Sequence, residues 1–273
     1  MNTELISTEK YSAPALSKGL DILELLATQT NGLKKNEIAQ ALGRSVSELY
    51  RMLAVLVARG YVQFEEESER YALTMRLFEL SHRYPPTRRL TAVAGRIMEQ
   101  TAIALNQSLH LAIPYDSEIL VVAQVDSPGN NITVVRLGAQ VPMVLTSSGA
   151  SLLHLLTYAE RHAICAKNAA FTSEAMDVFE EAVEQVIASG VCESPSSVIQ
   201  GVLNLSVPVF GYAGEVVAAL TIPHVQRLHA NQDPDVEECK RTLVEAGRMI
   251  SKKIGAGAAQ DENSGSARSA EAT

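Results

Sequence analysis

Residues 16–74 read LSKGLDILELLATQTNGLKKNEIAQALGRSVSELYRMLAVLVARGYVQFEEESERYALT, and this stretch decides the fold. Apolar residues recur at helical spacing over 16–28, and helix-like runs follow over 36–42 and 45–59. Gly43 separates these two runs and permits the tight turn that lets two helices cross steeply. The β-rich pieces that close the unit are 61–64 and 70–74. This order predicts a winged helix-turn-helix, whose third helix is free to enter a major groove.

The composition limits the class of protein. A chain of 273 residues can hold two domains, each with its own core. No apolar run reaches the roughly 18 residues that a membrane helix needs, and MNTELISTEK at the start lacks the apolar stretch of a signal peptide. Cys165, Cys192 and Cys239 lie far apart and form no Cys-x-x-Cys pair, which favours a reducing compartment over a disulfide framework or a zinc module. We therefore expect a cytoplasmic protein that makes no membrane contact.

The net charge of −8 is unusual for a protein that binds DNA until it is divided along the chain. Residues 1–90 hold 12 Lys and Arg against 11 Asp and Glu, whereas residues 91–273 hold 11 against 20. The acidity therefore belongs to the second part, where it keeps a domain that does not bind DNA away from the phosphates. The helix-turn-helix pattern, and not the charge, is what argues for DNA.

Five segments are expected from composition and patterning. Polar and aperiodic residues open the chain, and a Gly/Ala/Ser-rich tail without large apolar side chains closes it, so both ends are expected to be unfolded. The pair Pro85-Pro86 is expected to stop a helix and to mark a hinge between the domains. The expected segments are an unfolded start over 1–12, a winged helix-turn-helix domain over 13–76, a linker over 77–90, an effector-binding domain over 91–255 and an unfolded tail over 256–273.

The second half alternates between helical and strand patterns. Two of its strand pairs are joined by short polar or glycine-containing turns, 115–118 and 211–215, which predict antiparallel hairpins. Antiparallel hairpins flanked by helices predict an α+β domain rather than a βαβ fold. The expected helices cover 90–106, 147–156, 172–188 and 236–254, and the expected strands cover 109–114, 119–125, 132–137, 203–210 and 216–222.

Over residues 14–255 the chain resembles the IclR family of bacterial transcription regulators. In the first half the resemblance rests on ALSKGLDILELLA, EIAQALGRSVSELYRMLAVLVARGYV and YALTMRLFEL. In the second half it rests on LHLAIPYDSEILVVAQVDSP, RLGAQVPMVLTSSGASLL and QGVLNLSVPVFGYAGEVVAALTI. The resemblance implies a winged helix-turn-helix joined by a linker helix to a GAF-like antiparallel-sheet effector domain. It also implies dimers, often paired into tetramers, that bind a promoter palindrome and release or rearrange when a small metabolite binds.

The predicted recognition helix supplies most of the candidates for DNA contact. Ser45 is a plausible N-cap, and Glu48 three residues later completes a capping box. An apolar stripe of Leu49, Met52, Leu53 and Leu56 faces the core, so other faces of the helix remain for the groove. Arg51 suits guanine or phosphate, unless it is merely solvated or paired with Glu48. The candidates for DNA contact are Lys34, Lys35, Arg44, Ser45, Val46, Ser47, Tyr50 and Arg51.

Three features depart from the family pattern. Lys34 and Lys35 stand where the family carries a capping hydroxyl and an apolar residue, and they either clamp a phosphate or are two exposed lysines. Their charges at the positive end of the second helix cost a few tenths of a kcal/mol each. Glu48 is unusual on a recognition helix unless it accepts a cytosine amino group. The wing carries Glu65, Glu66, Glu67 and Glu69 beside Arg70, so we expect it to stand clear of the DNA backbone.

An effector pocket needs an apolar cavity with a few convergent polar groups. The resemblance places these groups in the loop-to-helix turn over 144–149, on the strand pair 203–222 and in the loop before it. Backbone N–H groups at the start of the helix that begins at Ser147 are suited to a carboxylate. The alternative is that Ser147 merely caps this helix and that Asn204 satisfies a strand end. The effector candidates are Val144, Ser147, Ser148, Gly149, Ser194, Asn204 and Thr221.

Two further departures from the family pattern and one histidine bear on the chemistry of the ligand. The family's lysine after this glycine is Ala150 here, and its histidine near the turn is Val144, which favours a more apolar pocket. His110 is expected either to face the pocket or to be a satisfied core histidine. The other histidines show no ligand spacing, so no metal site and no cofactor are expected; they are His82, His154, His162, His224 and His229.

The sequence favours a regulator over two alternatives. An enzyme is disfavoured because residues 149–153 lack the second glycine of a nucleophile elbow, and Gly255-x-Gly257 follows no strand. A ligand-binding or oligomerisation adaptor without DNA binding is slightly favoured by the acidic wing. The resemblance implies a repressor of a catabolic operon. We expect double-stranded promoter DNA, a small organic acid and a second copy of the chain as its partners.

Overall fold

The computed structural model describes residues 13–82, 85–129, 133, 135–227 and 233–256. The chain divides into two compact units, residues 1–85 and 86–273, which we describe separately. The two ends that were expected to be unfolded lie outside the described residues, apart from Ala256. No helix of the described residues is long and apolar enough to cross a membrane.

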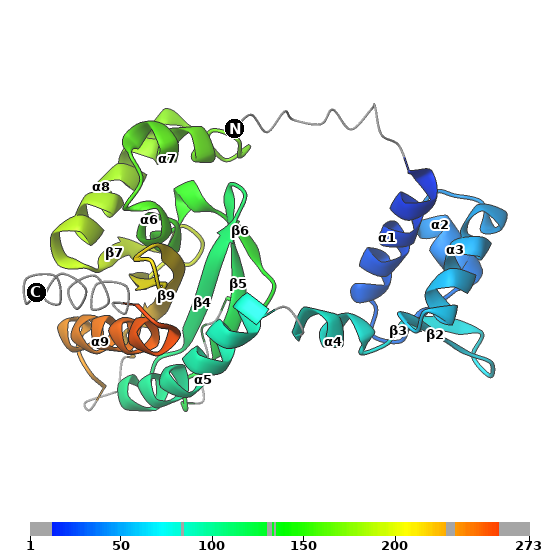
Figure 1. Ribbon diagram of the computed structural model, residues 1–273, viewed down its shortest axis with the longest axis horizontal. Helices are drawn as coiled ribbons and strands as arrows, with labels where there is room; N and C mark the ends of the chain where they lie inside the picture. Colours follow the sequence, from blue (N-terminus) through cyan, green and yellow to red (C-terminus); the bar gives the residue numbers. More distant parts are fainter. Residues whose placement is uncertain (1–12, 83–84, 130–132, 134, 228–232, 257–273) are drawn as a thin grey trace, which may run out of the picture. The chain divides into compact units, whose positions relative to one another are not determined.

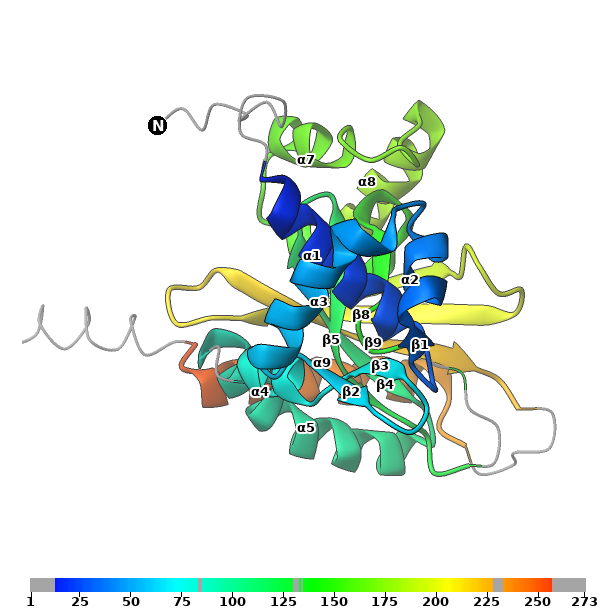
Figure 2. The same cartoon turned by 90° about the vertical axis from the view of Figure 1, so that its right-hand side faces the viewer.

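The first unit is a winged helix-turn-helix (Figure 1). Its three helices are α1 (Pro14–Ala27), α2 (Lys35–Ala41) and α3 (Val46–Ala58), and Figure 2 views the unit from the side on which all three are seen together. The wing strands β2 (Val62–Glu65) and β3 (Arg70–Leu73) pair antiparallel, and the short strand β1 (Leu33–Lys34) pairs with β3 on the other side. The sequence predicted the two wing strands but not β1.

The core of the first unit follows from the apolar stripes of its helices. Ile22 of α1, Ile38 of α2 and both Leu49 and Leu53 of α3 are buried together. Gly43 has φ +61°, so the turn between α2 and α3 uses the left-handed conformation that glycine adopts without strain. This turn sets the angle at which α3 leaves the core, with one face packed and the opposite face in solvent.

Helix α4 (Arg76–His82) ends before the proline pair, and helix α5 (Pro85–Leu105) starts at it. The two compact units divide between these prolines. The pair was expected to stop a helix, but the sequence did not predict that it also begins one, since the next helix was expected from residue 90. The physical reason is that the first turn of a helix leaves its N–H groups unpaired, so proline loses nothing there and its fixed φ favours the helix.

The second unit is built on one antiparallel sheet of six strands. Its strand order is β6-β5-β4-β9-β8-β7. The strands are β4 (Leu109–Tyr115), β5 (Glu118–Val125), β6 (Gln140–Pro142), β7 (Cys192–Pro195), β8 (Val202–Phe210) and β9 (Val216–Val225). Both predicted hairpins are present. The strand expected over 132–137 is wrong for its described residues, while the short strands β6 and β7 were not predicted.

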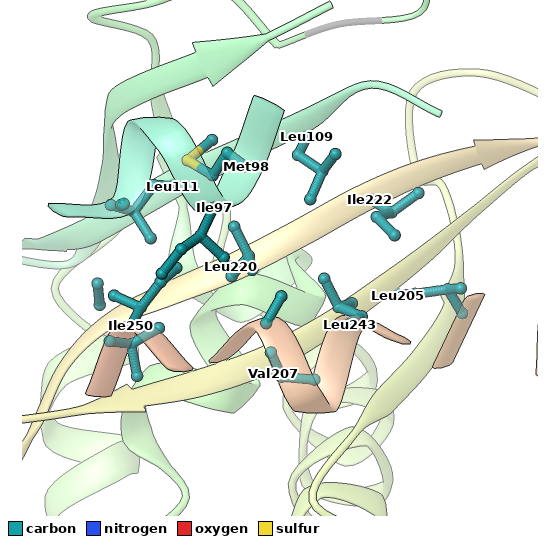
Figure 3. Close-up of a cluster of buried hydrophobic side chains, with 14 of the residues drawn as sticks. Ile97, Met98, Leu109, Leu111, Leu205, Val207, Leu220, Ile222, Leu243 and Ile250 are labelled. Atoms are coloured by element: carbon teal, nitrogen blue, oxygen red, sulfur yellow. The ribbon is translucent and has the colours of Figure 1, made fainter. Parts of the chain in front are cut away.

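Helices cover both faces of this sheet. Helices α5 and α9 (Val236–Ile254) lie on one face, and Figure 3 shows their side chains packed over Leu220 and Ile222 of β9. On the other face lie α6 (Ser147–Leu153), α7 (Tyr158–Cys165) and α8 (Ser173–Ser189), preceded by the 3-10 turn η1 (Met143–Leu145). Because side chains alternate along β9, Ala219 and Thr221 face α6. The α+β architecture is therefore as predicted.

Candidate nucleic-acid interface and ligand site

One face of α3 is exposed along its length. Ser47, Tyr50, Arg51 and Ala54 recur at intervals of three and four residues and are all exposed, with 58% of Tyr50 accessible. Leu49 and Leu53 of the same helix are buried. The helix therefore presents a polar stripe outward while its apolar stripe holds it to the core, which is the geometry needed by a helix that enters a groove.

Arg51 is the cation on this stripe, and it has no carboxylate partner among the described residues. Within the described residues its guanidinium makes no hydrogen bond or ion pair, and Glu48 bonds to other groups. Lys35 lies beside the stripe, with its Nζ 5.6 Å from the centre of the Tyr50 ring. Such a cation over an aromatic face is attracted to it. Arg51 and Lys35 thus supply positive charge at the exposed face.

Glu48 is engaged at the start of α3. Its carboxylate accepts hydrogen bonds from the Ser45 backbone N–H at 3.1 Å and the Ser45 hydroxyl at 3.0 Å, and it pairs with Lys18 Nζ of α1 at 2.9 Å. These contacts, led by the one from Lys18, lower the pKa of Glu48 from 4.5 to about 2. The predicted capping box is therefore present. Glu48 completes the cap and pairs with α1, so its carboxylate is occupied in a way that does not suit the reading of a cytosine.

Other candidates for DNA contact have partners within the first unit. Arg44 pairs with Asp21 of α1 at 3.2 Å, and Lys34 pairs with Glu69 of the wing at 3.2 Å. Val46 is half-buried against the core, which removes it from the face that was expected to enter the groove. From helical periodicity alone, Val46 lies off the apolar stripe of α3 and was therefore assigned to the exposed side. Periodicity does not reveal the contact between α1 and the first turn of α3. Sequence reasoning also missed Lys18 and Asp21, whose role depends on this tertiary contact.

Three buried hydroxyls form a chain of hydrogen bonds between α6 and the sheet of the second unit. Ser148 of α6 and Thr221 of β9 are 2.8 Å apart at their oxygens, and the Thr221 hydroxyl donates to Ser206 Oγ of β8 at 2.8 Å. All three side chains are at most 2% exposed. The structure therefore brings together Ser148 and Thr221, two of the residues proposed from the sequence for an effector site. It adds Ser206, which stands opposite Thr221 in the strand register.

The remaining effector candidates differ in their position and in how deeply they are buried. Ser194 and Asn204 are opposite each other in β7 and β8 and are half-buried. Val144 is buried in η1, and Ser147 is buried at the start of α6. Thr146, and not Ser147, caps this helix, since its hydroxyl accepts from the Gly149 N–H at 3.0 Å. The Gly149 N–H is thus already bonded and is not free for a carboxylate.

Gly149 has a steric role. A Cβ at this position would lie 2.3 Å from the carbonyl oxygen of Met143, so only glycine lets η1 and α6 approach this closely.

Two polar atoms beside the hydroxyl chain have no partner among the described residues. They are His110 Nδ1 of β4 and Ser151 Oγ of α6, and both are buried. Burial lowers the pKa of His110 from 6.5 to about 4. His110 lies opposite Thr221 in the strand register, so it faces the layer of buried polar groups between α6 and the sheet, which we call the polar layer. The sequence allowed His110 to be a core histidine with all its hydrogen bonds made, but its Nδ1 has no partner among the described residues.

A separate groove of about 1370 Å³ lies at the far end of α6, between the ends of α8 and α9. Arg248, Lys252 and Phe210 are among the residues that line it, and none of the predicted effector residues does. Ser148, Thr221 and Ser206 do not line this groove, and their hydroxyls bond to one another. No group of three or more His, Cys, Asp or Glu side chains within the described residues is arranged to hold a metal ion.

Comparisons with known proteins account for nearly the whole chain. Residues 15–66 match the family model described as the IclR helix-turn-helix domain, and residues 82–252 match the model described as the bacterial transcriptional regulator IclR C-terminal domain. The HTH-type transcriptional regulator KdgR of Escherichia coli is 27% identical over 253 residues, covering 89% of this chain and 94% of its own. The glycerol operon regulatory protein of Streptomyces coelicolor is 25% identical over 246 residues, covering 89% and 97%.

Solved structures share the fold. The IclR of Thermotoga maritima superposes with a TM-score of 0.70 at 24% identity, covering 88% of this chain and 98% of that one. An IclR homologue of Microbacterium hydrocarbonoxydans, complexed with 4-hydroxybenzoate, superposes with a TM-score of 0.74 at 22% identity, with the same coverage.

Proposed function

Because the chain belongs to the IclR family of bacterial transcriptional regulators, we propose that it represses a catabolic operon and leaves its operator when a small organic acid binds. DNA binding and transcription regulation come with the family. The proposal adds repression, the class of operon and the acid. It is supported by the names of relatives, which include a glycerol operon regulatory protein and the repressor AllR of Salmonella.

The observation that carries the DNA-binding mode is the exposed stripe of α3. Ser47, Tyr50 and Arg51 reach outward, and Lys35 adds charge beside them. We assign base contact to Arg51 and Tyr50 and phosphate contact to Lys35 and Ser47. Lys34, Arg44 and Ser45 lie at the edge of this face and contribute to DNA contact only by exchanging their present partners for phosphate.

The effector site lies in the polar layer between α6 and the sheet. Ser148 and Thr221 form its inner wall, Val144 lies in η1 and Ser147 lies at the start of α6. Ser194 and Asn204 lie at the β7–β8 side, and Gly149 permits the close approach of η1. Hydroxyl and amide groups suit the oxygen atoms of a small acid. The acid acts because it binds one state of the protein better than the other.

Fluorescence anisotropy of labelled promoter DNA at several salt concentrations tests this function. A regulator binds the DNA upstream of its target genes, and its affinity falls steeply with salt because phosphate contacts release counterions. An adaptor without DNA binding, which the acidic wing favours, gives no salt-dependent shift. A thermal-shift screen of aromatic, keto and sugar acids tests the effector. Neutral aromatic compounds that stabilise the protein where no acid does would contradict the acid.

We further propose a homodimer, or two dimers paired as a tetramer, that acts in the cytoplasm without catalysis. One winged helix reads only half of a palindrome, so a second copy is needed about one turn of DNA away. Exposed apolar side chains support pairing: Leu16 and Leu20 of α1 are 64% and 49% accessible, and Met75 and Leu80 near α4 are 66% and 52% accessible. Such side chains are stabilised when a second copy covers them.

A further inference from the structure

His110 stands in a row of side chains that crosses the sheet on the face covered by α6. In the strand register it is opposite Thr221 of β9, which is opposite Ser206 of β8. Residues paired in this way point to the same face of a sheet with neighbouring side chains. His110 is therefore the next member of the row that contains the buried hydroxyl chain.

This row contains unmet hydrogen-bonding capacity. His110 is 4% exposed and Ser151 of α6 is fully buried, yet His110 Nδ1 and Ser151 Oγ have no partner among the described residues. Ser151 lies one turn after Ser148 on the same helix. A buried polar atom without a partner is destabilising, and native proteins supply a partner in nearly every case. Both atoms therefore point to a molecule that enters this layer.

Among the described residues, the row that contains His110 has no charged side chain to receive an acid. Burial alone lowers the pKa of His110, with no charged group contributing. Its neighbours in the strand register are Gln124 of β5 and Thr221 of β9, and the row continues through Ser206 of β8 to Cys192 of β7. Burial raises the pKa of the Cys192 thiol to about 12, so this thiol is also neutral. The Gln124 amide donates to Asp126, which is exposed at the end of β5. The buried Arg161 elsewhere in this unit is held by Glu180.

We propose that His110 pairs with the carboxylate of the effector, and that the acid binds together with one proton taken from solvent. The proposal rests on the effector site proposed above. A carboxylate is strongly disfavoured in a buried layer unless a cation accompanies it. His110 is the group of the row that becomes a cation on binding a single proton. Its Nδ1–H then donates to one carboxylate oxygen, and Ser151 Oγ, the other buried atom without a partner, is the donor proposed for the second oxygen.

The proposal fixes how affinity depends on pH. His110 is neutral in the free protein at pH 7, because its pKa is about 4. In the complex the carboxylate raises this pKa above the working pH. Between the two pKa values each bound acid takes up one proton, so the dissociation constant rises about tenfold for each pH unit. Hydrogen bonds without protonation would leave the affinity independent of pH.

Calorimetric titration of the full chain tests this proposal, with pyruvate, D-gluconate and 4-hydroxybenzoate as probes of the keto, sugar and aromatic acids. Titrations in phosphate and in Tris at pH 7 give the number of protons taken up, because the two buffers absorb different amounts of heat when they lose a proton. We expect about one proton for wild type. His110→Asn keeps a donor near the Nδ1 position but accepts no proton, so it should bind at least about tenfold more weakly with uptake near zero.

His162→Asn is the matched control, because this histidine is exposed on α7, and it should behave as wild type. Acid binding to wild type without proton uptake, or full uptake by His110→Asn, would overturn the role of His110 and leave the acid effector in place. Failure of all three acids to bind wild type would overturn the acid effector itself. If His110→Asn does not fold, the wild-type dissociation constant between pH 6 and pH 8 decides. A tenfold rise per unit supports the proposal, and a flat profile overturns it.

Discussion

Arg51 of the recognition helix has no carboxylate partner among the described residues, unlike three of the cations around it. Lys18, Lys34 and Arg44 are each within 3.2 Å of an acidic oxygen, so their charges are partly neutralised before DNA arrives. A solvent-exposed pair of this kind contributes little to stability, and phosphate can replace the carboxylate. Arg51 needs no such exchange and extends from the middle of the exposed stripe.

Replacing Arg51 with alanine is expected to weaken operator binding by about 1–3 kcal/mol, because a guanidinium that contacts a base or phosphate is lost. Effector binding should not change. Arg76→Ala is the matched control, since its guanidinium pairs with Glu79 on α4. Anisotropy titration at a single salt concentration makes the comparison, and equal operator affinity for Arg51→Ala and wild type would contradict the assignment.

His110 is expected to make the second unit sensitive to acid. Its pKa is about 4 in the folded protein against an ordinary value of 6.5, so the unfolded chain binds more protons between these values. Stability is therefore greatest above about pH 6.5 and falls as the pH decreases. The loss between pH 7 and pH 5 is about 2 kcal/mol. Urea unfolding of wild type and His110→Asn at both values measures it, and an equal loss in the variant would contradict this origin.

At the scale of elements, long amphipathic patterns were sufficient to predict structure. The helix expected over 236–254 has those bounds, and its buried face includes Leu243 and Ile250. The two hairpins were also predicted, because a polar turn between two alternating runs has few other solutions. The short elements β1, β6, β7 and α7 were not predicted. The strands β1, β6 and β7 depend on the strand with which each one pairs. Helix α7 instead has a local signal that was missed, the capping box between Thr157 and Glu160.

Within the candidate sites, contacts between residues close in sequence could be predicted, and contacts between distant residues could not. Capping of α3 by Ser45 is a local contact and could be inferred from a spacing of three residues. The pairs Lys18–Glu48 and Asp21–Arg44 join residues far apart in sequence, so no local pattern reveals them. The burial of His110 could be inferred from its apolar neighbours, but not the absence of a partner for its Nδ1.

The junction of η1 and α6 is expected to tolerate no side chain at Gly149. A Cβ there would lie 2.3 Å from the Met143 carbonyl oxygen, so Gly149→Ala should lower the free energy of unfolding by about 1–3 kcal/mol. Gly95→Ala within α5 is the control. Its Cβ would meet nothing within 4 Å, so it should raise the free energy by about 0.5–1 kcal/mol. Thermal unfolding compares them, and a Gly149→Ala protein as stable as wild type would contradict the close packing.

At the scale of the whole molecule, assembly decides whether a palindrome can be read. We expect sedimentation to show a dimer or a tetramer at micromolar concentration. Leu20→Glu on α1 places a charge on the exposed apolar surface and should shift the population toward monomer and weaken operator binding, because the two half-sites are no longer bound together. Glu24→Lys on the same helix is a charge-change control. A wild-type monomer with full operator affinity would contradict the assembly.

The central claim is that an acid bound in the second unit controls the affinity of the first unit for DNA. The most direct test is an anisotropy titration of promoter DNA with the full chain, with and without the acid that gives the largest thermal shift. We predict that the acid weakens operator binding by about 5–150-fold, which is the usual range of coupling between two sites. Operator affinity that is the same at zero and at saturating acid would contradict the account.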